Sequence, residues 1–207
     1  VHDMMMFMRD YLQGTELDMS KDFGAGPHAV PYRWRPLTWK VDGVQYVNER
    51  ATATQQTGFS FVAQSRSWLP DEIGGIAWLA LDNVATSIYI PVYCSVTDLP
   101  QSYKTDGRRT GFSSSSAWWV FNRLGTLAAQ RWGDMRHDVD AVWVPWQKEL
   151  FGKQQDIEQK ALELYDPKNP QKTVSFLSDY TNEWGEKVIK KAWELGDFLW
   201  TKYDEKF

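Results

Sequence analysis

Cysteine and histidine are scarce in this chain, and their scarcity argues against two kinds of site. The single cysteine, Cys94, cannot form an internal disulfide, so nothing in the sequence requires an oxidising compartment. The three histidines, His2, His28 and His137, lie far apart and show none of the short spacings that are typical of a metal site. We therefore expect no bound metal and no cofactor.

Long apolar runs and an excess of positive charge are also absent. No stretch approaches the roughly 20 apolar residues of a membrane span, and a net charge of −4 argues against a nucleic-acid surface. A solvated turn explains the basic pair Arg108-Arg109 in its Gly/Ser-rich loop. The chain begins inside an expected helix and without Met, so we expect a trimmed N-terminus. The sequence therefore leaves the cellular location open.

Tryptophan is the residue in excess, with 12 copies alongside 9 Tyr and 10 Phe. A glycan-binding face would expose several of these rings together, whereas packing would disperse them through the core or an interface. Most of the tryptophans fall at helical or strand spacing. This distribution favours packing.

Residues 1–112 are expected to form a β-rich part that follows a helix and a long loop. Residues 1–12 are predicted to be helical up to Gly14, and the Gly- and Pro-rich residues 14–36 form a long ordered loop, a common location for sites. Asp42-Gly43 predicts a hairpin. The predicted strands are residues 37–41, 44–47, 51–56, 59–66, 76–81 and 86–93.

Two of these strands have a predicted place in the sheet. The apolar run 76–81 is typical of a buried central strand. Pro91 cannot donate a ladder hydrogen bond, so the strand over 86–93 is expected at an edge or with a bulge.

Residues 113–207 are expected to form a helical region that packs on the β-rich part as one compact unit. Ser113–Ser116 offer capping hydroxyls for a helix over 117–132. A second helix is predicted over about 135–165, which Pro145 should start, kink or break, and Thr173 should cap a final one. The order of helix, sheet and three helices predicts an α+β fold.

Few residues have the surroundings that catalysis needs. Cys94 follows a predicted strand with no histidine pattern nearby, so we interpret it as a small buried residue rather than a nucleophile. The carboxylate pair Asp71-Glu72 is explained by a solvated turn, and Gly24-x-Gly26-Pro27 lacks the lysine of a phosphate loop.

Arg33 and Arg66 are the candidates for binding substrate or an oxyanion. Arg33 lies between aromatic and proline residues in the long loop, and Arg66 ends a predicted strand. A guanidinium held in this way suits fork-like recognition of a carboxylate. The alternative is a structural ion pair, or stacking against Trp34 and Trp68.

Several short motifs together carry a family resemblance. They are Gly14-Thr15, Leu17-Asp18-Met19, Ala25-Gly26-Pro27, Pro31-Tyr32-Arg33 and Ala63-Gln64-Ser65-Arg66, supported by Trp78, residues 88–93 and Phe121-Asn122-Arg123. Over about residues 1–132 the chain resembles the C-terminal part of C69-family dipeptidases, which are N-terminal-nucleophile (Ntn) cysteine hydrolases.

The resemblance implies an αββα sandwich to which this chain contributes strands and one helical layer. It also implies a peptidase that cleaves dipeptides with an N-terminal cysteine, whose own α-amine acts as the base. Val1 is no nucleophile, so we expect a fragment that is inactive alone and whose partner is the missing N-terminal half. Exposed sheet edges would then allow the chain to form a homo-oligomer.

Two other functions stay open. An Ntn amidase that acts on non-peptide C–N bonds would share the fold, and the nucleophile-bearing half would discriminate the two. A non-catalytic module built on the tryptophans would expose several of those side chains on one face.

Overall fold

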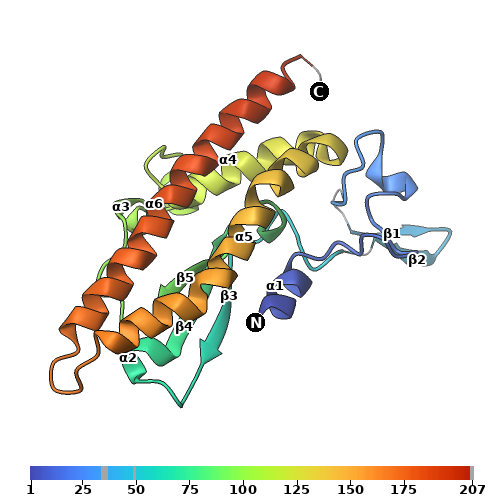
Figure 1. The fold of residues 1–207 in the computed structure, drawn as a ribbon. Helices are drawn as coiled ribbons and strands as arrows, with labels where there is room; N and C mark the ends of the chain where they lie inside the picture. The colour runs from blue at the N-terminus through green and yellow to red at the C-terminus, as the bar shows by residue number, and fades with distance from the viewer. Residues whose placement is uncertain (34–36, 49, 206–207) are drawn as a thin grey trace.

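The computed structural model describes residues 1–33, 37–48 and 50–205. It has an α+β architecture in which the long helices α5 and α6 run side by side next to a small sheet (Figure 1). The elements are α1 (His2–Met8), η1 (Phe23–Ala25), β1 (Thr38–Val41), β2 (Val44–Val47), β3 (Phe59–Ser65), α2 (Asp71–Gly74), β4 (Gly75–Leu81), η2 (Val84–Thr86), β5 (Ile90–Tyr93), α3 (Gln101–Lys104), η3 (Arg108–Thr110), α4 (Ala117–Gln130), α5 (Trp132–Glu163) and α6 (Gln171–Lys202).

The main sheet is antiparallel, with the strand order β3-β4-β5. Strand β4 lies in the centre, as predicted, and buries Ile76, Trp78 and Ala80 against the helices. Strand β5 lies at an edge, as Pro91 predicted, and the Pro91 carbonyl accepts a hydrogen bond of 3.0 Å from Thr181 in α6. The helical layer is thus bonded directly to the edge of the sheet.

The opposite face of this sheet is also apolar, and no helix within the described part of the chain forms a layer on it. Phe59 and Phe61 are 61% and 57% exposed and their rings stack at 6.4 Å. They pair with Leu81 and Leu79 of β4, which are half-buried. This open face therefore presents a continuous apolar surface.

The core lies between the sheet and the helices α4, α5 and α6. The predicted stripe of α6 is buried in full, at Leu177, Trp184, Val188, Leu195 and Leu199. Residues from both parts of the chain share this one core. Among the described residues, no helix has the length and apolar character needed to cross a membrane.

The hairpin was predicted correctly, but the first helix is shorter than predicted. Asp42 and Gly43 both take positive φ between β1 and β2, as the turn requires. The first helix ends at Met8, because the Asp10 carboxylate accepts the Leu12 amide at 2.7 Å and forms a turn instead.

The predicted strand over 51–56 is wrong, and the strand over 86–93 is shorter than predicted. The Thr54 hydroxyl accepts the Gln56 amide and holds a turn where the strand was expected. Asn83 caps η2 through the Ala85 amide at 3.1 Å, so the chain becomes extended enough for pairing only from Ile90.

The helices differ from prediction at their caps and breaks. Ser116 precedes α4 but caps it with no side-chain bond, because its hydroxyl donates to the Thr105 carbonyl. Pro145 lies inside one continuous helix that already begins at Trp132. Thr173 lies within α6 and donates to the Ala161 carbonyl at 3.1 Å, which fastens α6 to α5.

Candidate functional site

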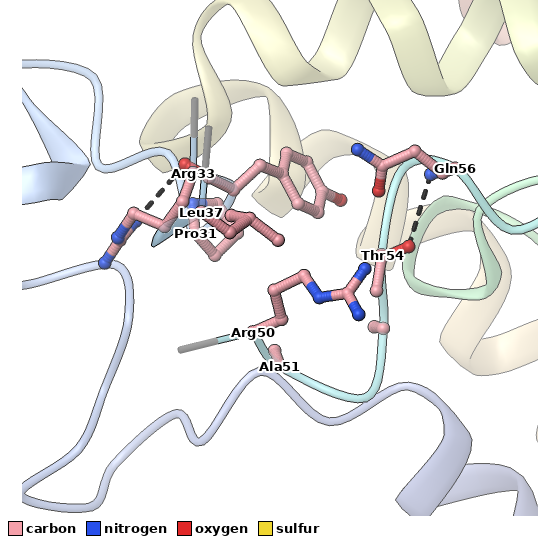
Figure 2. Close-up of a pocket in the computed structure, with 9 residues that line it drawn as sticks. Pro31, Arg33, Leu37, Arg50, Ala51, Thr54 and Gln56 are labelled. Carbon is pink, nitrogen blue, oxygen red and sulfur yellow. Dashed lines mark hydrogen bonds between the residues drawn. The ribbon is translucent and has the colours of Figure 1, made fainter. Parts of the chain in front are cut away.

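The guanidinium of Arg33 holds the long loop together. It donates to the carbonyls of Val30 at 3.0 Å and Met19 at 2.8 Å, and it pairs with Asp22. Figure 2 shows this guanidinium pointing away from the adjacent hollow, whereas that of Arg50 points into it. Arg33 therefore has a structural role in the loop. Trp34, its expected stacking partner, lies outside the described residues.

The guanidinium of Arg66 is buried at the end of β3. It donates to the carbonyls of Gly74 at 3.2 Å and Ile73 at 2.9 Å, and it pairs with Glu158 of α5. The other proposed stacking partner, Trp68, is 77% exposed. Arg66 thus joins the sheet, α2 and α5.

The structure does not bring the two arginines together. Arg33 lines the same cavity as Gln56, which comes just before β3, whereas Arg66 follows the last residue of that strand. A seven-residue strand separates these two points by about 20 Å. A single substrate group held by both guanidiniums is incompatible with this placement.

A polar cavity of about 450 Å³ opens instead where β4 ends and α4 passes. This volume falls within the roughly 300–1,000 Å³ of small-molecule sites. A second cavity of about 630 Å³ adjoins it along the long loop and shares four of its residues. The first, which we call the amide cavity, is lined by Gln55, Gln56, Thr57, Asp82, Asn83, Arg108, Trp118, Trp119, Asn122, Gly125, Thr126, Ala129 and Gln130.

Asp82 is the buried acid of the amide cavity. It has a positive φ of 57°, and its backbone amide donates to the Gly58 carbonyl at 2.9 Å. Its carboxylate accepts from the Asn122 amide at 2.8 Å. Burial raises the pKa of Asp82 to about 6, although the Asn122 amide, the Asn83 backbone and Arg108 act against this rise.

Asn83 connects this acid to the long loop. Its side chain donates to the hydroxyl of Tyr32, and the Tyr32 ring packs edge-on against Trp132 at 5.3 Å. Burial raises the pKa of Tyr32, so that hydroxyl stays protonated at neutral pH. The end of β4 and the loop that contains the strongest family motifs are therefore fixed to one another.

Arg108 forms the cationic side of the amide cavity. It is exposed, and no ion pair involves it in the part of the chain that the structure describes. Its loop is fastened to α4, because the Trp119 indole donates to the Gly107 carbonyl at 3.0 Å. The Trp118 indole donates to the Gly58 carbonyl at 2.9 Å and so fixes the other wall.

A cluster of charged side chains packs against η2 and bonds to its backbone through Arg9. Arg9 is 5% exposed and donates to the Ala85 carbonyl at 3.5 Å, and Asp140 lies 4.0 Å from Arg9 and 2.8 Å from Arg136. Burial, and then Arg136, lower the pKa of Arg9 to about 10. Two guanidiniums thus share one carboxylate beneath the turn that carries Asn83.

Gly125 is the point of closest approach between α4 and the acid. A Cβ at this position would lie 2.9 Å from Thr86 Oγ1 and 3.0 Å from Asp82 Oδ2. Gly125→Ala should lower the free energy of unfolding by about 1–2 kcal/mol, because overpacking outweighs the better helix propensity. Urea denaturation measures this.

Gly152→Ala in α5 is the matched control, because a Cβ there meets open space. It should raise the free energy of unfolding by about 0.5–1 kcal/mol. Equal effects of the two substitutions would contradict the close contact at Gly125.

Cys94 is exposed, not buried as expected, and its side chain packs next to Gly75. No histidine contacts it among the described residues, and an internal residue has no free α-amine. No group of three metal-binding side chains occurs in residues 1–33, 37–48 and 50–205.

The tryptophans are dispersed, as packing predicts. Trp78, Trp132, Trp143 and Trp184 are buried in the core. Of the tryptophans that the structure describes, the most exposed are Trp39, Trp68 and Trp200, which belong to β1, the loop after β3 and α6. This dispersal counts against a glycan-binding module built on one tryptophan-rich face.

Sequence reasoning did not select Asp82, Asn122 or Arg108, which line the amide cavity, although Asn122 belongs to one of the family motifs. Asp82 follows an apolar strand directly, which is the one local signal that was available. No curated protein matches the chain. The sequence model of peptidase family C69 matches residues 1–144, which is more than half of the chain and includes the whole amide cavity. The chain therefore belongs to peptidase family C69.

Proposed function

We propose that this chain is part of a cysteine dipeptidase and provides its substrate-binding region, while the nucleophile lies outside the chain. The observation that carries the proposal is the amide cavity within the C69-matched residues. Its walls offer both donors and acceptors, which suits a peptide bond and the polar ends of a short peptide.

The proposed location of the nucleophile follows from Cys94. An Ntn thiol needs the free α-amine of its own residue as the base, and Cys94 follows Tyr93 at the end of an edge strand. The open apolar face at Phe59 and Phe61 supports a further layer that packs there. In the proposed enzyme, a second sheet covers this face.

Turnover by the product of the complete gene tests this function. We expect it to cleave a panel of dipeptides, with both amino acids detected by mass spectrometry, and to lose activity after alkylation of its thiols. The 207-residue chain alone should release neither amino acid. Cleavage of N-acyl amides but of no dipeptide would replace the proposal with the amidase function.

A further inference from the structure

The amide cavity is lined by two side chains of opposite charge, which are the two charges that a small zwitterion would need. Asp82 is 2% exposed and lines the cavity at the end of β4. Arg108 lines the same cavity from η3 and is exposed. Among the described residues that line the cavity, no other has an ionisable side chain, so Asp82 and Arg108 are the charges that this lining presents to a ligand.

The acid is built to receive a donor. Among the described residues, its only side-chain hydrogen-bond partner is the neutral amide of Asn122, and it forms no ion pair. Burying a carboxylate without a cation is costly, and a ligand ammonium inside the cavity would relieve that cost. The strained φ of Asp82 and the lack of a side chain at Gly125 allow the carboxylate to lie where β4 and α4 meet.

The backbone at Arg108 is fixed by contacts of its loop, whereas its guanidinium takes no part in fixing it within the described part of the chain. Trp119 fastens Gly107 to α4, and a Cβ at Gly107 would lie only 3.1 Å from Trp118, so the backbone before Arg108 has little freedom. The N–H donors of the Arg108 guanidinium are therefore available to bind a ligand. A planar fork of this kind suits a carboxylate.

We propose that Asp82 binds the free α-ammonium of a short peptide and that Arg108 binds its α-carboxylate. Together they select unblocked dipeptides. The inference rests on the proposed function and adds to it two specificity-determining residues. If the inference is correct, blocking the amino end of the substrate removes the interaction with Asp82, and blocking the carboxyl end removes the interaction with Arg108.

The test compares alanyl-leucine with N-acetyl-alanyl-leucine and alanyl-leucine amide, using the product of the complete gene. The wild-type enzyme should prefer the unblocked dipeptide over the acetylated one by on the order of 100-fold in kcat/KM, because acetylation leaves the buried acid unpaired. Asp82→Asn should bring this ratio close to one by slowing the unblocked dipeptide. Arg108→Gln should instead reduce the preference for the free carboxylate over the amide.

Asp106→Asn and Arg109→Gln are the matched controls, because both residues are exposed neighbours that do not line the amide cavity. Both ratios should match wild type in these variants. An Asp82→Asn enzyme that slows the blocked and unblocked substrates equally would show a structural role and overturn the proposal. The proposal would also be overturned if Asp82→Asn and Arg108→Gln both kept the wild-type ratios of kcat/KM between unblocked and blocked substrates.

Binding to the 207-residue chain separates this proposal from the proposed catalysis. Saturation-transfer NMR should detect alanyl-leucine on the wild-type chain and on Asp106→Asn, but not on Asp82→Asn. Asp82-dependent binding without turnover by the complete gene product would refute the dipeptidase and retain the zwitterion site. Turnover with unblocked and blocked substrates treated alike would refute the site and retain the dipeptidase. Absence of binding to the wild-type chain overturns the site.

Discussion

Arg66→Met is expected to lower the free energy of unfolding by about 3–5 kcal/mol, because it leaves a buried carboxylate without its cation. The Glu158 side chain is only 13% exposed, and Arg66 is its ion-pair partner. Neutral donors remain, since Gln154 donates to Glu158 at 2.9 Å and Tyr93 lies at 3.5 Å. These groups do not replace a positive charge.

The same substitution also removes two structural hydrogen bonds. The carbonyl of Ile73 loses its side-chain donor, and leaving a buried acceptor unpaired costs free energy of its own. The carbonyl of Gly74 loses one of its two donors and keeps the backbone amide of residue 66. Urea denaturation followed by tryptophan fluorescence measures the total loss.

Two further variants test whether the unpaired charge causes the loss of unfolding free energy in Arg66→Met. Lys153→Met breaks an exposed pair with Glu149 on the same helix and should cost no more than about 0.5 kcal/mol. The double variant Arg66→Met/Glu158→Met should recover part of the loss, because it removes the unpaired charge. A loss in Arg66→Met as small as that in Lys153→Met would show that the buried pair contributes little.

Local chemistry determined which parts of the fold were predictable. The turn at Asp42-Gly43, the buried run that forms β4 and the stripe of α6 each depend on neighbouring residues, and all three were predicted correctly. The two errors in the strands arose where a side chain bonds the backbone amide two residues further on. The turn at Thr54 and the cap at Asn83 are such cases, and there a few hydrogen bonds override β-propensity.

The site was harder to predict, because its residues meet across long stretches of sequence. Arg66 was predicted to bind substrate or an oxyanion, with a structural ion pair as the alternative, and the partner in its ion pair, Glu158, lies 92 residues away. Asp82 looks like an ordinary turn residue until Asn122 and Gly125 of α4 pack on it. Only the fold distinguishes such a buried acid from a solvated one such as Asp42.

Asp82→Asn is expected to stabilise the protein at pH 8 by about 2–3 kcal/mol and to have almost no effect near pH 3.5. Burial raises the pKa of Asp82 from 3.8 to about 6, a shift of about two units at roughly 1.4 kcal/mol each. A carboxyl whose pKa is raised by folding is more easily ionised in the unfolded chain. Stability is therefore lost as the pH rises from about 4 to 6.

The variant removes this loss because an asparagine cannot ionise. It keeps the shape of the side chain and an oxygen that can accept from Asn122. The difference in the free energy of unfolding between wild type and variant should grow as the pH rises from about 4 to 6 and then level off. Urea denaturation at several pH values gives the curve, and the exposed Asp106→Asn provides a control that should stay within about 0.5 kcal/mol throughout.

A gain in stability at pH 8 would also bear on function. Residues that destabilise a fold persist where they serve a site, and their removal commonly stabilises the protein at the expense of activity. If Asp82→Asn is more stable and no longer distinguishes blocked from unblocked dipeptides, the buried charge serves the ligand. If it is less stable at pH 8, the ionised carboxylate supports the fold, and Asn122 and Arg108 offset its burial more strongly than the raised pKa implies.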